Sequence, residues 1–116
     1  MMNIEIGTNI LLLDTVKFKM ITPSLIVFLT VLSQAGTQFG CVPTITGAAF
    51  ESYPPKGYHG KGYAWDIRTK DIKDPFGYAA WIMIELKKMS KRYRIVYGDS
   101  THTDHIHVEY RYDIAE

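Results

Sequence analysis

The longest apolar stretch in the chain, residues 21–32, predicts a helix. Thr22 can cap its first amides, and Pro23 suits the first helical position. Apolar side chains then recur at helical spacing and also fill the positions between, namely Leu25, Ile26, Val27, Phe28, Leu29, Val31 and Leu32. Because they occur all round the helix, we expect it to be largely buried and to end at Gly36 or Gly40.

A second helix is predicted from Asp74-Pro75, which is again a capping residue followed by a proline. Its expected core-facing stripe is Phe76, Ala79, Ala80, Met83 and Leu86. Its C-terminal end is cationic, with Lys87, Lys88, Lys91 and Arg92. These charges complement the helix dipole, and binding of phosphates or anionic lipid is the alternative interpretation.

Short β-prone stretches surround the two helices. The alternation in residues 64–68 predicts a strand with Asp66 on one face and Trp65 and Ile67 on the other. Further strands are expected at 41–46, 93–97 and 104–112, with a loop at 52–57, a turn at 98–100, and one or two short strands or an extended arm within 3–19. Strands that do not alternate regularly with helices indicate an α+β fold, with a small, largely antiparallel sheet packed with two main helices.

Length and composition bound the function. A chain of 116 residues has the length of a single domain, with residues 1–19 as the arm or short strands and 20–112 as the core. The net charge of +1 is not that of a dedicated nucleic-acid binder, so we expect no nucleic-acid partner. The single cysteine, Cys41, excludes an intrachain disulfide and a cysteine-rich zinc finger. We expect a monomer.

The apolar run at 21–32 also raises the question of export. Lysines precede it and small residues follow it, which is the order found in a signal peptide. Its late start and the segment Thr22-Pro23-Ser24 fit a helix N-terminus better. It is also shorter than the roughly 20 apolar residues that span a bilayer. We therefore expect neither an export signal nor stable membrane insertion.

The chemistry is predicted from the four histidines. His59 and Asp66 frame one glycine-rich stretch, and the other three histidines cluster at 102–107. In the last predicted strand, alternation places His105, His107 and Glu109 on one face. An open catalytic zinc site takes three protein ligands and leaves a fourth position for water. We predict His59, Asp66 and His107 as these ligands, with iron, nickel or cobalt as less suitable ions.

Asp104 is the candidate general base, because a carboxylate near activated water can take its proton. An ideal strand would place Asp104 on the opposite face from His107, three residues later. The assignment therefore predicts a bend or turn where the strand begins.

The motifs resemble those of a known family. His59-x-x-Gly62-x-Ala64-x-Asp66, followed by Asp104-His105-Ile106-His107-Val108-Glu109, is similar to the zinc D-alanyl-D-alanine carboxypeptidases. That family includes phage endolysins that cleave L-alanoyl-D-glutamate, and it shares its fold with the Hedgehog signalling domain. The resemblance covers roughly residues 20 to 112.

The resemblance implies a Hedgehog/DD-peptidase-like fold and a zinc-dependent metallopeptidase that cuts stem-peptide amides of peptidoglycan. It implies His59, Asp66 and His107 as zinc ligands, Asp104 as general base, and His105 as the group that stabilises the tetrahedral intermediate. The localisation is left open by the sequence. The compact chain, without a wall-binding module or clear export signal, fits a phage lysis enzyme in the host cytoplasm that reaches the cell wall through another factor.

The chain departs from the family at two places. Gly57 stands where family members usually have serine. The segment 46–50 lacks the arginine that members tend to carry before the first motif. Arg68 and Lys61 are the candidate replacements.

Two other function classes remain open. One is a zinc-binding module of the same fold with weak or no catalysis, which the missing arginine makes possible. The other is a metal-dependent nuclease, since Asp104-His105-Ile106 resembles the opening of a His-Asn-His motif. That motif needs a further asparagine or histidine on a helix some twenty or more residues downstream, and the sequence given stops at Glu116.

Overall fold

The computed structural model describes residues 3–6, 10–13, 16–18, 20–48, 57–99, 102 and 104–115, without the side chains of residues 3–6, 13, 59 and 60.

The described strands form one six-stranded sheet in the order β1-β2-β3-β4-β6-β5. Their bounds are β1 (Asn3–Ile6), β2 (Ile10–Leu13), β3 (Thr44–Gly47), β4 (Ala64–Arg68), β5 (Tyr93–Val96) and β6 (His105–Tyr110). Every neighbouring pair is antiparallel except β2 and β3, which run parallel. The predicted α+β class with two main helices is confirmed, and the one parallel pair is an addition to it. Residues 3–6 and 10–13 form short strands, one of the two alternatives expected there.

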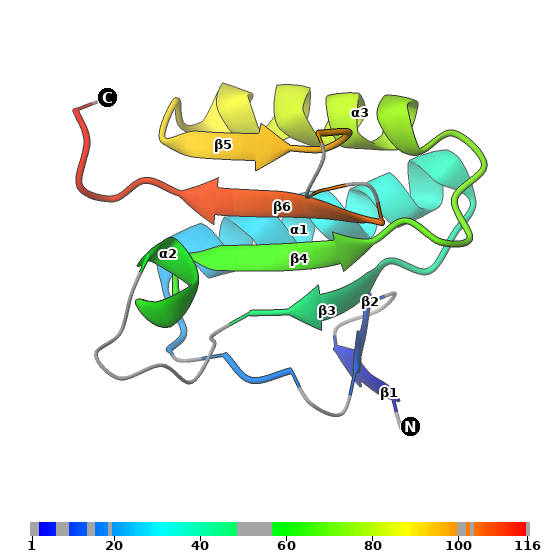
Figure 1. Cartoon of the computed structure of the whole chain (residues 1–116), viewed down its shortest axis with the longest axis horizontal. Helices are drawn as coiled ribbons and strands as arrows, with labels where there is room; N and C mark the ends of the chain where they lie inside the picture. The colour runs from blue at the N-terminus through cyan, green and yellow to red at the C-terminus, as the bar shows by residue number, and fades with distance from the viewer. Residues whose placement is uncertain are drawn as a thin grey trace.

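Two long helices, α1 (Pro23–Phe39) and α3 (Pro75–Met89), cover one face of the sheet (Figure 1). The core lies between these helices and the inward side chains of the strands, which include Ile45, Trp65, Ile67, Ile106 and Val108. Phe28 of α1 stacks on Trp65 of β4, with ring centroids 4.7 Å apart. The opposite face of the sheet, which we call the site face, carries the polar residues of β4 and β6.

The helix α1 begins and ends as the sequence predicts. The Thr22 hydroxyl accepts a hydrogen bond from the amide of Leu25, and Gly40 ends the helix with a left-handed φ of 63°. Its burial is one-sided, however: Leu25, Phe28, Val31 and Leu32 are buried, but Ile26 is 54% exposed. The expectation that the helix is largely buried thus holds for the face toward the sheet and not for the outer face. Only one face of α1 can contact the sheet. No helix within the described residues is long and apolar enough to cross a membrane.

The helix α3 starts at its predicted cap, where the Asp74 carboxylate accepts from the amide of Gly77. The predicted core stripe is confirmed at Ala79 and Leu86 and is wrong at its other three positions. Phe76 is 65% exposed, and Ala80 and Met83 are exposed too. The residues that are buried are Tyr78, Ala79, Ile82 and Leu86. Large apolar side chains occur on several faces of this helix, so periodicity alone allows more than one core-facing stripe. Contact with α1 and the sheet selects the stripe that contains Tyr78 and Ile82.

The remaining differences lie near His59. Residues 57–60 form a short helix, α2 (Gly57–Gly60), and not the end of a loop. Residues 52–56 of the predicted loop lie outside the described residues. The strands β5 and β6 fall within the ranges predicted for them, and β4 coincides with its range. The strand β3 starts three residues later than predicted and extends one residue further, to Gly47.

Candidate metal centre

The site is built where β4 and β6 pair. Their register sets Asp66 directly across from His107, and Arg68 across from His105. Trp65 and Ile67 on β4, with Ile106 and Val108 on β6, point into the core and are buried. Because side chains alternate along a strand, burial of these four apolar residues directs Asp66, His105 and His107 to the site face. The predicted placement of Asp66 opposite Trp65 and Ile67 is confirmed.

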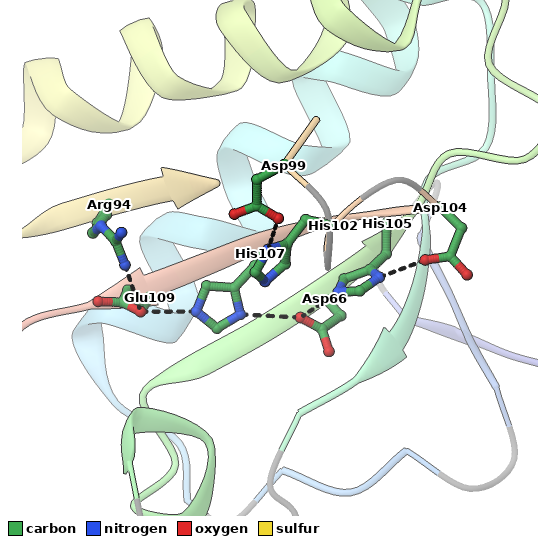
Figure 2. A network of polar contacts seen from close by, with 8 residues as sticks. All are labelled: Asp66, Arg94, Asp99, His102, Asp104, His105, His107 and Glu109. Atoms are coloured by element: carbon green, nitrogen blue, oxygen red, sulfur yellow. Dashed lines mark hydrogen bonds and ion pairs between the residues drawn. The ribbon is translucent and has the colours of Figure 1, made fainter. Parts of the chain in front are cut away.

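Acidic and imidazole side chains alternate in one row along the site face (Figure 2). His107 Nδ1 lies 3.2 Å from Asp66 Oδ1, and His107 Nε2 lies 2.8 Å from Glu109 Oε1. On the other side, His105 Nε2 is 3.9 Å from Asp66 Oδ1, and His105 Nδ1 is 2.8 Å from Asp104 Oδ1. Asp66 thus stands between two histidines that come from one strand.

His102 lies beside this row. The His102 ring centroid is 5.1 Å from that of His105 and 5.5 Å from that of His107. Its Nδ1 lies 2.7 Å from a carboxylate oxygen of Asp99. His102 therefore packs against both histidines of β6, and its own ring is hydrogen-bonded to Asp99.

The surroundings shift two protonation equilibria. Burial alone would lower the pKa of His107, but its hydrogen bonds to Asp66 and Glu109, and the charges of both carboxylates, raise the pKa overall. The hydrogen bond from His105 is the main reason that the pKa of Asp104 is lowered. In the metal-free protein His107 thus holds its proton more firmly than an exposed histidine, and Asp104 stays ionised.

The three predicted ligands differ in what the structure describes. It brings Asp66 and His107 together, each about one-seventh exposed. His59 belongs to α2, which contacts β4 and β6 and lies at the start of β4 on the side away from α1 (Figure 1). The His59 side chain is outside the described residues. Among the side chains described, no three histidine, cysteine or acidic groups converge on one point that could hold a metal.

The described donors fit the demands of zinc. Two ligands on one tetrahedral ion, each about 2.0–2.2 Å from it, lie roughly 3.3–3.6 Å apart. The observed separation of His107 Nδ1 and Asp66 Oδ1 is 3.2 Å. The other ring nitrogen of His107 is bonded to a carboxylate, as is usual for a zinc-ligating histidine. Asp66 and His107 can supply two ligands, and the predicted site needs His59 as the third.

Asp104 and His105 lie next to this pair. Asp104 sits in a bend just before β6 begins, where the assignment as general base requires one. Its side chain is 88% exposed and bonds to His105. The catalytic roles of Asp104 and His105 remain predictions.

Sequence reasoning gave no role to Glu109, Arg94 or Arg111. Alternation along β6 already placed Glu109 on the same face as His107, and this was the sequence feature that could have indicated a role for Glu109. Arg94 faces Glu109 across the β5–β6 pair, a neighbour that depends on strand register and so on the fold.

A pocket with a volume of about 410 Å³ opens at the Arg68 end of β4. Arg68 lies on the same face as Asp66, and its guanidinium is 3.1 Å from Asp71. Other lining residues are Leu11, Gly40, Cys41, Val42, Thr44 and Ile72. The guanidinium of Arg68 therefore lies on the same face as Asp66, two residues further along β4.

Comparison with family models, with curated proteins and with solved structures finds no match to this chain. The resemblance of the two motifs to the zinc carboxypeptidases thus remains a prediction from the residues themselves.

Proposed function

We propose that this chain is a zinc-dependent metallopeptidase that hydrolyses amide bonds in the stem peptides of peptidoglycan. The observation that supports it best is the contact of His107 with Asp66, two residues 41 positions apart that the motifs nominate as ligands. A histidine and a carboxylate in contact on an otherwise polar sheet face suit zinc chemistry.

Each residue has a distinct role in this proposal. His59, Asp66 and His107 hold the ion. A bound zinc ion would activate water and polarise the scissile carbonyl. Asp104, ionised and exposed, takes the proton of the attacking water and passes it to the leaving amine. His105 donates toward the oxygen that becomes negatively charged.

The substrate class is the one that the motif resemblance implies, and the position of Arg68 supports it. D-Ala-D-Ala and L-Ala-D-Glu amides both carry a carboxylate on the residue that leaves. Arg68 supplies a cation on the same face, two residues from Asp66. We assign Arg68 the binding of that carboxylate, in place of the arginine missing from 46–50. Asp71 must then release the guanidinium when substrate binds.

The test compares wild type with His59→Ala and uses His102→Ala as the matched control. Bound zinc is measured after dialysis, and hydrolysis is followed as amino groups released from purified cell-wall fragments. We expect His59→Ala to lose both zinc and activity, whereas His102→Ala keeps its zinc. A wild-type chain that binds zinc but releases no amino groups would instead indicate the catalytically inactive zinc-binding module. A wild-type chain that binds no zinc would refute the proposal.

A further inference from the structure

Glu109 is a buried carboxylate at the end of the polar row, with its side chain 8% exposed. A buried charge needs compensating partners. Arg94 Nη1 lies 3.6 Å from Glu109 Oε1, and Arg111 Nε lies 3.3 Å from Oε2 without forming an aligned hydrogen bond. These two cations compensate the charge, but the shortest contact of Glu109 is the one with His107 Nε2, at 2.8 Å.

The strand register holds Glu109 in this position. Ala64 on β4 and Arg94 on β5 are its cross-strand neighbours. Ala64 is fully buried and carries only a methyl group, so the space beside His107 is left to the longer Glu109 side chain. Glu109 and His107 are two positions apart on one strand, which puts their side chains side by side on the site face.

This arrangement decides which ring nitrogen of His107 carries the proton when the ring is neutral. A neutral imidazole has one donor nitrogen and one acceptor nitrogen. Each ring nitrogen faces one carboxylate, and only one of the two nitrogens can carry the N–H that donates. Glu109 lies 2.8 Å from Nε2, and Asp66 lies 3.2 Å from Nδ1. The contact with Glu109 is the shorter of the two. The Nε2–H tautomer therefore leaves the Nδ1 lone pair facing Asp66.

We propose that Glu109 is a positioning residue, which fixes the Nε2–H tautomer of His107 and so presents Nδ1 to an ion shared with Asp66. The identity of that ion rests on the proposed function, but the tautomer does not. Without Glu109, the remaining contact with Asp66 would favour a proton on Nδ1, the nitrogen that the ion needs. Carboxylates that orient a metal-ligating histidine in this way typically contribute 10–100-fold to metal affinity.

A purely structural role for Glu109, as a partner for Arg94 and Arg111, is the competing explanation. It predicts that replacement lowers stability but leaves the tautomer of His107 unchanged. The variants Glu109→Met, which removes the acceptor, and Glu109→Gln, which keeps one, separate the two explanations. Glu85→Gln is the matched control, because it removes a carboxylate of α3 that pairs with Lys88.

Two readouts are needed, both on the full chain. The first is two-bond ¹H–¹⁵N correlation NMR of the metal-free protein, at a pH where His107 is neutral; with four histidines the spectrum can be assigned from single variants. The second is zinc affinity by competition with a chromophoric chelator. We expect Nε2–H in wild type and in Glu85→Gln, and Nδ1–H in Glu109→Met with zinc affinity lowered by about 10–100-fold. The Glu109→Gln variant should lose less affinity than Glu109→Met.

A wild-type His107 with its proton on Nδ1 would overturn the proposal, even if no variant folds. So would a folded Glu109→Met protein that keeps the Nε2–H tautomer and binds zinc within twofold of wild type. Because the tautomer is measured without metal or substrate, a wild-type chain that fails to hydrolyse peptidoglycan refutes the proposed function and leaves this test intact.

Discussion

The substitution Ala64→Leu tests the packing that supports the candidate metal centre. Ala64 is fully buried, faces Glu109 across the β4–β6 pair and lies on the same face as Asp66, two positions on. Directly opposed residues of antiparallel strands have their Cβ atoms about 4.5–5.5 Å apart. The three additional carbons of leucine would therefore enter the space that Glu109 occupies. The cost of such overpacking is typically about 1–3 kcal/mol.

That cost converts into a measurable change in melting temperature. With an unfolding entropy of about 2.1 cal/mol/K per residue, a chain of 116 residues has roughly 0.24 kcal/mol/K at its midpoint. We therefore expect Ala64→Leu to melt about 4–12 °C below wild type. Because the leucine displaces Glu109 from His107, we also expect zinc affinity to fall by about 10-fold or more.

The assays are thermal unfolding followed by circular dichroism and zinc competition with a chelator. Ala64→Gly is the control, because it adds no atoms at this position and leaves the Glu109–His107 contact in place. It should keep zinc affinity near that of wild type, with a stability loss of about 1 kcal/mol from backbone entropy. An Ala64→Leu protein with wild-type melting temperature and zinc affinity would refute the packing argument.

Three further predictions follow from the site. In the zinc-free protein, the raised pKa of His107 contributes stability that is fully present below its ordinary value of 6.5 and is lost as pH rises through the folded-state pKa. Urea unfolding across this range, with chelator present, should show the loss in wild type and not in His107→Gln. Replacing the proposed base, Asp104→Asn, should lower kcat by about 10²–10⁴-fold and leave zinc affinity unchanged, and a normal kcat would exclude it as the base. Replacing the proposed carboxylate-binding group, Arg68→Ala, should raise KM for cell-wall peptides more than it lowers kcat, and unchanged kinetics would exclude this role.

The parts of the fold that could be predicted depend on local signals. Thr22-Pro23 and Asp74-Pro75 begin the two helices because capping is decided by adjacent residues. The alternation around Asp66 was equally readable, since the core side of β4 is apolar. The core stripe of α3 was not, because several of its faces are apolar and only the packing against α1 selects one.

In the candidate site, too, some residues are indicated by local pattern and others depend on how the strands pair. The histidines and acids on one face of β6 follow from period two alone. The contact of Asp66 with His107 also required the register of β4 and β6, which the local pattern does not contain. The family resemblance implied only that both residues are ligands of one ion. Arg94 enters only through a third strand, β5, so no motif in either half of the sequence indicates it.

Both histidines of the polar row belong to β6, the last in chain order of the strands that the structure describes. The partner of Asp66 is therefore synthesised some forty residues after it, so the proposed ion could bind this pair only after β6 has been made. A slip of β6 by a single residue would turn His105 and His107 toward Trp65 and destroy the pair without changing any amino acid. In the proposed zinc site, uptake of the ion would thus report that β6 has docked in its correct alignment.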